Sequence, residues 1–405
     1  LQVYVRGSFG ALPEALEQDF QVRSGDPRFG HTAARRVRLA DGSEAYSLVY
    51  KVAAEVGELG DNVAAIRAAI IDDALLHHLL ETPDVELDLL AHTRWASVGV
   101  INEANAHPLN HELEGYEDRA NVVAALNGDV DNYRALMDEA GLAMPEGITT
   151  DAKVIPVLVA HAMAAGQAPA EAFRRTVARF EGSVAIGLAT AEEPGKLYLA
   201  LRGSGQALYV GCSEDAFLVA SEPYGIVEET PHYVRMDGET PADPAKPSSR
   251  GQVMVLDASK AGELDGIARS SYGGVALPVT DDDMARVEVT TRDIDRGEHR
   301  HYLHKEISES PLSVRKTLRG RLATENDLTR AVLGEANMPA SIVEALREGR
   351  ITRIRVIGQG TAAVAGMGVA EAIRSALGGT GPSVDAIPAS EVSGFHLRDD
   401  MSGDL

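Results

Sequence analysis

Hydrophobic and polar positions along the middle of the chain predict a series of strands. The segments 184–188 and 197–201 place a large apolar residue at every second position, and 217–220 is a short continuous apolar run. Ahead of them, the apolar residues of 154–162 fall on one helical face, and Asp151 stands where a helix N-cap belongs. This part of the chain is therefore expected to mix sheet and helix.

The two ends of the chain have different patterns. Residues 50–80 show helix-like spacing of alanine, isoleucine and leucine, whereas 1–47 is broken by glycine and proline and is hard to read. Near the other end, 351–357 alternates as a strand, 362–377 follows as a helix of small residues, and 383–388 is a second short strand. This order opens a parallel βαβ unit, which needs more strands than remain, so we expect the given residues to stop inside a domain.

Two further segments separate these regions. Residues 238–250 are rich in proline, aspartate and serine without a period, which is typical of a surface loop. Residues 307–322 have a helical pattern with basic residues in the later part, as suits the C-terminal end of a helix dipole. We interpret this second segment as a connector.

Length and composition indicate an ordinary globular protein. The 405 residues are enough for two or three domains, and 44% hydrophobic and 24% charged residues match a folded chain. No window is long and apolar enough for a membrane span, and residues 1–10 lack a signal-like region. The one cysteine, Cys212, can form neither an internal disulfide nor a cysteine metal cage. We therefore expect a cytoplasmic protein without a membrane partner.

The charge of the chain argues against nucleic acid as its main partner. Lysine and arginine number 38 and acidic residues 61, which gives a net charge of -23. Binding to a phosphate backbone depends on clustered positive charge, so the field of this chain has the wrong sign.

Two pairs of residues are candidates for a chemical role. Arg94 and Trp95 follow the apolar run 87–91, where a guanidinium could clamp a carboxylate or form a structural ion pair. Asn127 and Gly128 follow another strand-like run, and their side-chain amide and backbone N–H are the donors that an oxyanion hole needs. The alternative for the second pair is a simple hairpin turn, because Asn-Gly favours one.

Other polar segments are less specific. Asp151 is either a helix cap or a carboxylate that holds a ligand ammonium. Residues 358–361, between a strand and a helix, could cradle a phosphate, although they lack the full dinucleotide and phosphate-loop motifs. The spacing of His299, His301 and His304 matches none of the usual zinc patterns, so no metal site is expected there.

Taken together, these segments resemble one enzyme family. Segments 91–97, 105–108, 127–129 and 150–151 are similar to the class II glutamine amidotransferase domain. Segment 300–311 is similar to the linker of the glucosamine-6-phosphate synthases, which are glutamine:fructose-6-phosphate aminotransferases (isomerizing). Segments 358–361 and 389–391 are similar to the start of the first sugar isomerase (SIS) domain of the same enzymes. The linker segment separates this family from the phosphoribosylamine-forming amidotransferases, which share the glutaminase domain.

The resemblance implies an α/β fold in separate parts. It implies a four-layer αββα glutaminase of the N-terminal-nucleophile (Ntn hydrolase) type over 1–290, a linker over 291–325, and the first part of an αβα, flavodoxin-like sugar isomerase domain over 326–405. The implied enzyme is a transferase of amino sugar biosynthesis that converts fructose 6-phosphate and glutamine to glucosamine 6-phosphate and glutamate. The implied protein is a homodimer formed through its isomerase domains, and no cofactor is implied.

The resemblance also assigns roles to the candidate residues. Arg94 would bind the α-carboxylate of glutamine and Asp151 its α-ammonium. Asn127 and Gly128 would form the oxyanion hole for the tetrahedral intermediate.

Three more residues match substrate-site positions of the family. Trp95 matches a tryptophan associated with closing the glutamine site, and His107 lies in a matching Asn-Ala-His-Pro motif near that site. Thr361 matches a position in the sugar-phosphate site at a helix start.

The chain departs from the family pattern at several positions, among them Ser97 and Val98, which replace the usual threonine and histidine, and two departures bear directly on its chemistry. The family nucleophile is a cysteine at the mature N-terminus, whereas residue 1 is Leu1 and no first strand is recognisable, so we expect the given residues to be an incomplete and inactive part of the enzyme. Ala362 replaces a serine that would bind phosphate. Two alternatives therefore stay open: a non-catalytic or regulatory amidotransferase-like binding protein, or an amidotransferase that delivers ammonia to another phosphosugar.

Overall fold

The computed structural model divides the chain into two units, 1–295 and 296–405. It describes residues 1–24, 32–38, 43–53, 61–93, 99–112, 121–203, 205–246, 249–287, 296–319, 321–325, 328–332, 334, 338–392, 396–398 and 400–405. Domain boundaries at 290 and 325 remain a prediction.

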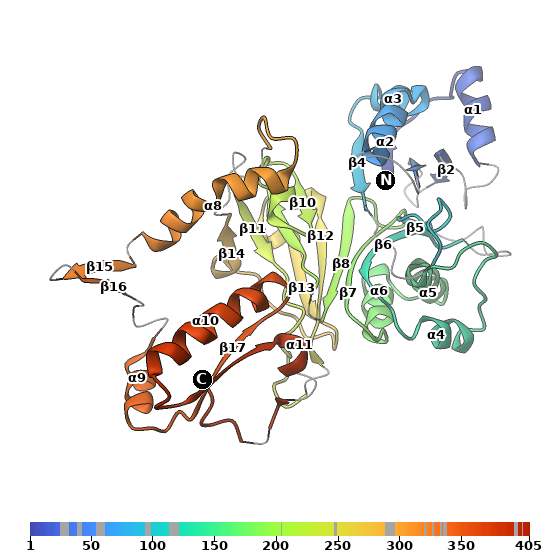
Figure 1. The fold of residues 1–405 in the computed structure, drawn as a ribbon. Coiled ribbons are helices and arrows are strands. Elements are labelled where there is room, and N and C mark those ends of the chain that lie inside the picture. Colours follow the sequence, from blue (N-terminus) through green and yellow to red (C-terminus); the bar gives the residue numbers. More distant parts are fainter. Residues whose placement is uncertain are drawn as a thin grey trace. The chain divides into compact units, whose positions relative to one another are not determined.

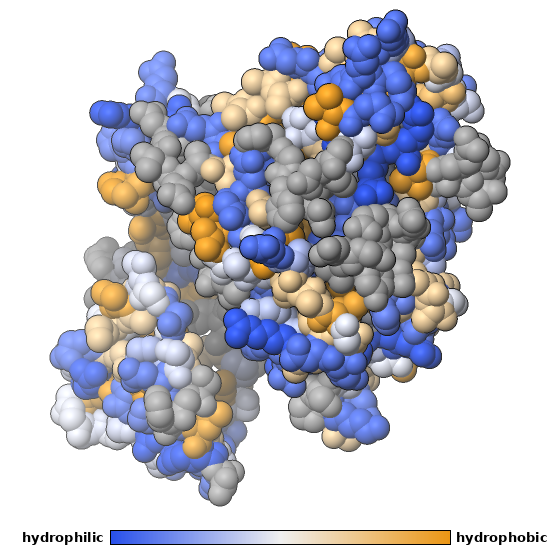
Figure 2. All heavy atoms as spheres, turned by 90° about the vertical axis from the view of Figure 1, so that its right-hand side faces the viewer, coloured by the Kyte–Doolittle hydropathy of each residue, from blue (hydrophilic) through white to orange (hydrophobic). Residues whose placement is uncertain are grey.

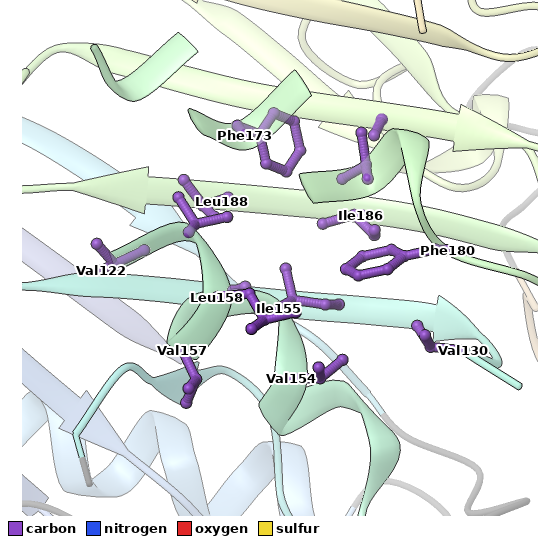
Figure 3. Packing of buried hydrophobic residues seen from close by; sticks show 14 of the residues in the cluster. Val122, Val130, Val154, Ile155, Val157, Leu158, Phe173, Phe180, Ile186 and Leu188 are labelled. Atoms are coloured by element: carbon purple, nitrogen blue, oxygen red, sulfur yellow. The ribbon is translucent and has the colours of Figure 1, made fainter. Parts of the chain in front are cut away.

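A six-stranded antiparallel sheet forms the centre of the first unit (Figure 1). Its strands, in spatial order, are β13 (Ile267–Ser271), β12 (Gln252–Asp257), β8 (Lys196–Arg202), β7 (Val184–Thr190), β6 (Val122–Gly128) and β5 (Leu109–Asn110). Helices α4 (Tyr133–Glu139), α5 (Val154–Ala164) and α6 (Pro169–Ala178) cover one face. Figure 3 shows Ile155 and Leu158 of α5 and Phe173 of α6 packed with Ile186 and Leu188 of β7. The alternation read from the sequence thus places these β7 residues in the core.

A four-stranded antiparallel sheet forms from the first ninety residues. Its order is β2 (Thr32–Arg38), β3 (Glu44–Tyr50), β1 (Gln2–Gly7) and β4 (Glu86–Leu90). Helices α1 (Glu14–Ser24), α2 (Asp61–Ile71) and α3 (Ala74–Leu80) pack on one face of it. The expected helix over 50–80 is therefore wrong at its beginning, because Tyr50 ends β3; residues 54–60 lie outside the described part.

A buried carboxylate links these helices to the sheet. Asp73 accepts a hydrogen bond from the hydroxyl of Tyr50 at 2.6 Å, caps α3 by accepting from the N–H of Leu76 at 3.0 Å, and pairs with Arg23 of α1 at 2.9 Å. Burial opposes ionisation of Asp73, but the bonds from Arg23 and Tyr50 outweigh it and lower the pKa of the carboxyl. One side chain thus ties α1, β3 and α3 together.

The two sheets pack face to face over a small cluster. Tyr4 and Leu90 of the N-terminal sheet are buried with Val123, Ala125 and Ala189 of the six-stranded sheet. The helices α1–α3 and α4–α6 lie on the outer faces of the two sheets. This order of layers is the αββα arrangement that the resemblance implies.

A further small sheet packs on the same inner face of the six-stranded sheet. Its strands are β10 (Phe217–Ala220), β9 (Tyr209–Cys212), β11 (His232–Arg235) and β14 (Met284–Arg286). The first unit also contains short 3₁₀ turns. One of them, η1 (Asp151–Lys153), leads directly into α5, and the others lie between strands: η2 (Pro223–Gly225), η4 (Ala258–Lys260), η5 (Leu264–Gly266) and η6 (Asp281–Asp283).

The second unit contains one parallel strand pair. Strands β17 (Arg353–Gly358) and β18 (Ser383–Pro388) pair in parallel, and α10 (Thr361–Leu377) connects them, which confirms the predicted βαβ unit. Its other elements are α8 (Tyr302–Leu318), β15 (Leu322–Glu325), β16 (Leu328–Ala331), α9 (Ala340–Arg347) and α11 (Ala389–Glu391). The basic helix expected over 307–322 therefore begins and ends four to five residues earlier, as α8.

Polar side chains cover most of one face of the described residues. On the face drawn in Figure 2, hydrophilic residues predominate and hydrophobic ones lie in small separate groups. Within the described part of the chain, every helix is too short or too polar to cross a membrane.

Candidate functional site

Asn105 joins two of the sequence segments that carry candidate residues. Its side chain is fully buried, and its amide nitrogen donates to the carbonyl of Val100 at 3.0 Å and to the hydroxyl of Thr149 at 3.2 Å. Its amide oxygen accepts from the N–H groups of Thr149 and Thr150, at 2.8 and 3.1 Å. The segment 99–107 is thereby fixed against the residues that precede Asp151.

His107 lies against the end of β6. Its Nδ1 accepts a hydrogen bond from the N–H of Leu126 at 3.3 Å, and its ring is 4.7 Å from the ring of His92, measured between centroids. In this tautomer the proton is on Nε2. The structure thus brings His107 beside the residue that precedes Asn127, as a shared site requires.

Asn127 and Gly128 end β6, and the hairpin alternative for them is wrong. They pair with Ala185 and Val184 of β7, to which β6 is connected through helices rather than through a tight turn. Gly128 has a φ of 109°, and a Cβ there would lie 2.0 Å from the carbonyl oxygen of Ser183. Only glycine fits this position without strain.

The side chain of Asn127 lies on the face of its sheet that looks toward the N-terminal sheet. Alternate residues of β6, such as Leu126, pack on the helices, whereas Val123 and Ala125 belong to the cluster between the sheets. Asn127 shares the second set and is exposed at the end of the strand. Its amide is therefore available to a ligand at this end of the space between the two sheets.

Asp151 is buried at the start of η1, and its expected role as an N-cap is wrong. Thr150 is the cap of η1 and Lys153 that of α5, neither with a side-chain capping bond. The Asp151 carboxylate instead accepts from the N–H of Val130 at 2.7 Å, just beyond the end of β6. Burial, with a contribution from Asp129, raises the pKa of the Asp151 carboxyl. A ligand cation would compensate the buried charge.

Lys51 is a candidate that the sequence did not single out. It follows β3 directly, only 7% of it is exposed, and the Glu103 carboxylate of the segment 99–107 is close enough to act on its charge. Burial lowers the pKa of Lys51 to about 8, although Glu103 acts in the opposite direction. An isolated lysine after a strand looks like an ordinary surface residue in sequence, so only the fold reveals it.

Other sequence candidates are not part of this cluster. Arg94 and Trp95 lie outside the described residues, and Thr361 is the exposed first residue of α10 in the second unit. Cys212 is half-buried in β9, and burial raises the pKa of its thiol, which disfavours a nucleophilic role. Where the chain is described, no three histidine, cysteine or acidic side chains gather as metal ligands.

The described groups together suit an α-amino acid. Asp151 offers a buried negative charge, Lys51 a buried positive one, and Asn127 an amide at the end of a strand. Opposite charges held on fixed elements are what a zwitterionic ligand requires.

Three of the curated proteins similar to this chain are aminotransferases of one kind. Each of the three is named glutamine–fructose-6-phosphate aminotransferase (isomerizing). That of Symbiobacterium thermophilum is 31% identical over 284 residues, 69% of this chain and 40% of that protein. That of Bacillus thuringiensis is 29% identical over 60% of this chain and 37% of that protein. That of Pseudomonas putida is 27% identical over 66% of this chain and 38% of that protein.

The chain is homologous to these aminotransferases. The resemblance read from the sequence motifs is thereby confirmed. The chain spans only 37 to 40% of the length of the relatives named above. No protein-family model matches it. A glutamine phosphoribosylpyrophosphate amidotransferase from B. subtilis covers 67% of this chain and 49% of its own, but at 14% identity and a TM-score of 0.37 that likeness carries no argument.

Proposed function

We propose that the chain carries the glutamine site of an aminotransferase that forms glucosamine 6-phosphate from fructose 6-phosphate. The observation that carries the proposal is the gathering of His107, Asn127 and Asp151 around the end of β6, with Asn105 fixing their segments to one another. The homology to enzymes named for this reaction supports the same assignment.

The proposed roles follow from the chemistry of glutamine. Asp151 binds the α-ammonium and Arg94 the α-carboxylate, because these opposite charges distinguish an amino acid from other amides. Asn127 and the N–H of Gly128 stabilise the oxyanion that forms when the amide carbon becomes tetrahedral. None of the 405 residues is assigned as the nucleophile, since Cys212 is the one cysteine and its thiol is half-buried.

The remaining assignments come from the resemblance. Trp95 closes the glutamine site, and His107 supports its wall through the bond to Leu126. Thr361 belongs to the sugar-phosphate site of the second unit. The partners are glutamine and fructose 6-phosphate, the protein is a cytoplasmic homodimer, and its chemistry uses protein groups without a cofactor.

The test uses purified full-length protein supplied with glutamine and fructose 6-phosphate. We expect formation of glucosamine 6-phosphate, and Asp151→Asn should raise the KM for glutamine by about 10- to 100-fold, because a bond to a charged group is lost. Activity with free ammonia should not change. The control Asp138→Asn alters an exposed carboxylate of α4. An unchanged KM, or a preference for another phosphosugar, would contradict the proposal; binding of glutamine without turnover would favour a non-catalytic protein.

A further inference from the structure

The strand register places Lys51 at the same end of the sheets as the candidate site. Strand β1 lies between β3 and β4 and is antiparallel to both, with Gln2 opposite Val49 and Leu90. The C-terminal ends of β3 and β4 therefore flank the start of β1. Lys51 follows the first of these ends and His92 the second, and the ring of His92 is next to that of His107.

The alternation of β3 indicates which face Lys51 occupies. Tyr46, Leu48 and Tyr50 pack against the outer helices, so the residue after Tyr50 turns to the opposite face, which looks toward the six-stranded sheet. Ser47 of that face is buried and accepts a hydrogen bond from Gln2 at 2.6 Å. Lys51 and Asn127 thus stand on facing surfaces at one end of the space between the sheets.

Lys51 lacks a compensating partner among the residues that the structure describes. They offer its ammonium neither a hydrogen bond nor an ion pair. Glu103 acts on it only through its field, and the α-amino group of Leu1 is close enough for the charge of Lys51 to contribute, after burial, to the lowered pKa of that group. Taking a charge out of water without a partner costs several kcal/mol, so such groups are rare unless a ligand or a change of protonation compensates them. Lys153, which is also buried, shows the usual solution: its ammonium donates to the carbonyl and side-chain oxygens of Asn110 at 2.8 and 3.0 Å.

We propose that Lys51 binds a carboxylate of the amino acid held in the candidate site. This inference rests on the proposed function and adds a second cation to it. The resemblance assigns one cation, Arg94, to the α-carboxylate, and Asp151 takes the ammonium. The γ-carboxylate that glutamine hydrolysis creates is the anion left for Lys51, and this residue therefore makes the site retain glutamate more tightly than glutamine.

The experiment measures the protonation of Lys51 directly. The chain has seven lysines, so protein labelled at the lysine ε-carbon gives few NMR signals, and Lys51→Met identifies the one of interest. The pH titration is repeated with glutamate, with glutamine, and with glutarate, a dicarboxylate without an ammonium. Binding of each ligand is measured in parallel by calorimetry. The control Lys196→Met removes a lysine of β8 that pairs with Glu193.

A bound carboxylate should raise the pKa of Lys51 by about one unit or more, and Lys51→Met should weaken glutamate binding at least about tenfold, while Lys196→Met leaves it unchanged. An effect with glutamate alone supports contact with the γ-carboxylate, whereas an equal effect with glutamine assigns Lys51 to the α-carboxylate. Amino-acid binding that neither changes the titration of Lys51 nor weakens in Lys51→Met would overturn the inference.

Failure of the proposed function gives a different result. If the chain binds neither amino acid, the glutamine site is refuted, and glutarate then decides on Lys51. If glutarate raises the pKa of Lys51, Lys51 still binds a carboxylate, but that carboxylate belongs to a ligand other than glutamine or glutamate. An unchanged pKa would overturn both proposals.

Discussion

Replacing Lys51 with methionine should stabilise the protein at neutral pH. Burial lowers the pKa of Lys51 from the ordinary 10.5 to about 8. This difference of about 2.5 is equivalent to about 3 kcal/mol of unfolding free energy, at 1.36 kcal/mol for each pKa unit. Methionine has nearly the same length and carries no charge, so the core should accept it at a cost below about 1.5 kcal/mol.

The sign of the pH dependence follows from the lowered pKa. Between pH 8 and 10.5 the unfolded chain binds more protons at Lys51 than the folded chain, so the stability contributed by this residue rises with pH. The penalty is complete below pH 8 and is lost toward pH 10.5. The advantage of Lys51→Met should therefore be about 2 to 3 kcal/mol at pH 7 and close to zero at pH 10.5.

Urea denaturation followed by circular dichroism at pH 7, 8, 9 and 10 measures this difference. Titrating groups that do not interact with Lys51 are common to both proteins and cancel when the two free energies of unfolding are subtracted at each pH, whereas Glu103 and the α-amino group of Leu1 interact with its charge and contribute to the difference. A variant that is less stable at pH 7, or a difference that does not change with pH, would refute the reasoning. Together with weaker glutamate binding, a gain in stability would identify Lys51 as a residue kept for binding at the expense of stability.

Three other substitutions test contacts of the fold, two of them at the candidate site. Gly128→Ala should destabilise the protein by about 2 to 4 kcal/mol in urea denaturation, because the new Cβ meets the carbonyl of Ser183; a loss below about 1 kcal/mol would show that the strand end relaxes freely. Asn105→Ala should cost about 2 to 4 kcal/mol and speed amide hydrogen exchange at Thr149, and unchanged exchange there would contradict the clamp. Asp73→Asn should cost about 3 kcal/mol at pH 7, measured by thermal unfolding. Since the pKa of this carboxyl is lowered in the fold, the cost should shrink as pH falls below 3.8; a cost independent of pH would argue against the ion pair.

Local pattern was sufficient for most of the central elements. The alternation over 184–188 and 197–201 gave β7 and β8, and the helical face over 154–162 gave α5, because these elements bury one face against a single core. The predicted strand, helix and strand near the C-terminus are likewise confirmed in β17, α10 and β18.

The N-terminal sheet could not be predicted from local pattern. Strand β1 alternates between the helical core and the cluster between the sheets, so Val3 and Tyr4 are both buried and the strand has no polar face to show its period. Its pairing partners in β3 and β4 lie between 37 residues (Gly7 and Glu44) and 88 residues (Gln2 and Leu90) away in sequence. Such a strand is recognised from tertiary contacts.

The site was predicted in part. The segments around His107, Asn127 and Asp151 do come together in the structure. The residue types in the sequence did not show which contacts hold these segments to one another. Asn105, which joins two of them, is recognisable only from its hydrogen bonds. Lys51 was missed because burial, rather than residue type or spacing, makes it unusual.

The small side chains between the two sheets have a consequence for how the site can change. Three of the six buried residues of the hydrophobic cluster between the sheets are alanines, Ala125, Ala189 and Ala191. Side-chain size at these positions acts as a spacer that sets the distance between the surface bearing Lys51 and the surface bearing Asn127. A single added methyl group there would push the two surfaces apart. The size of the molecule that the site accepts can therefore be tuned by residues that carry none of the proposed binding groups.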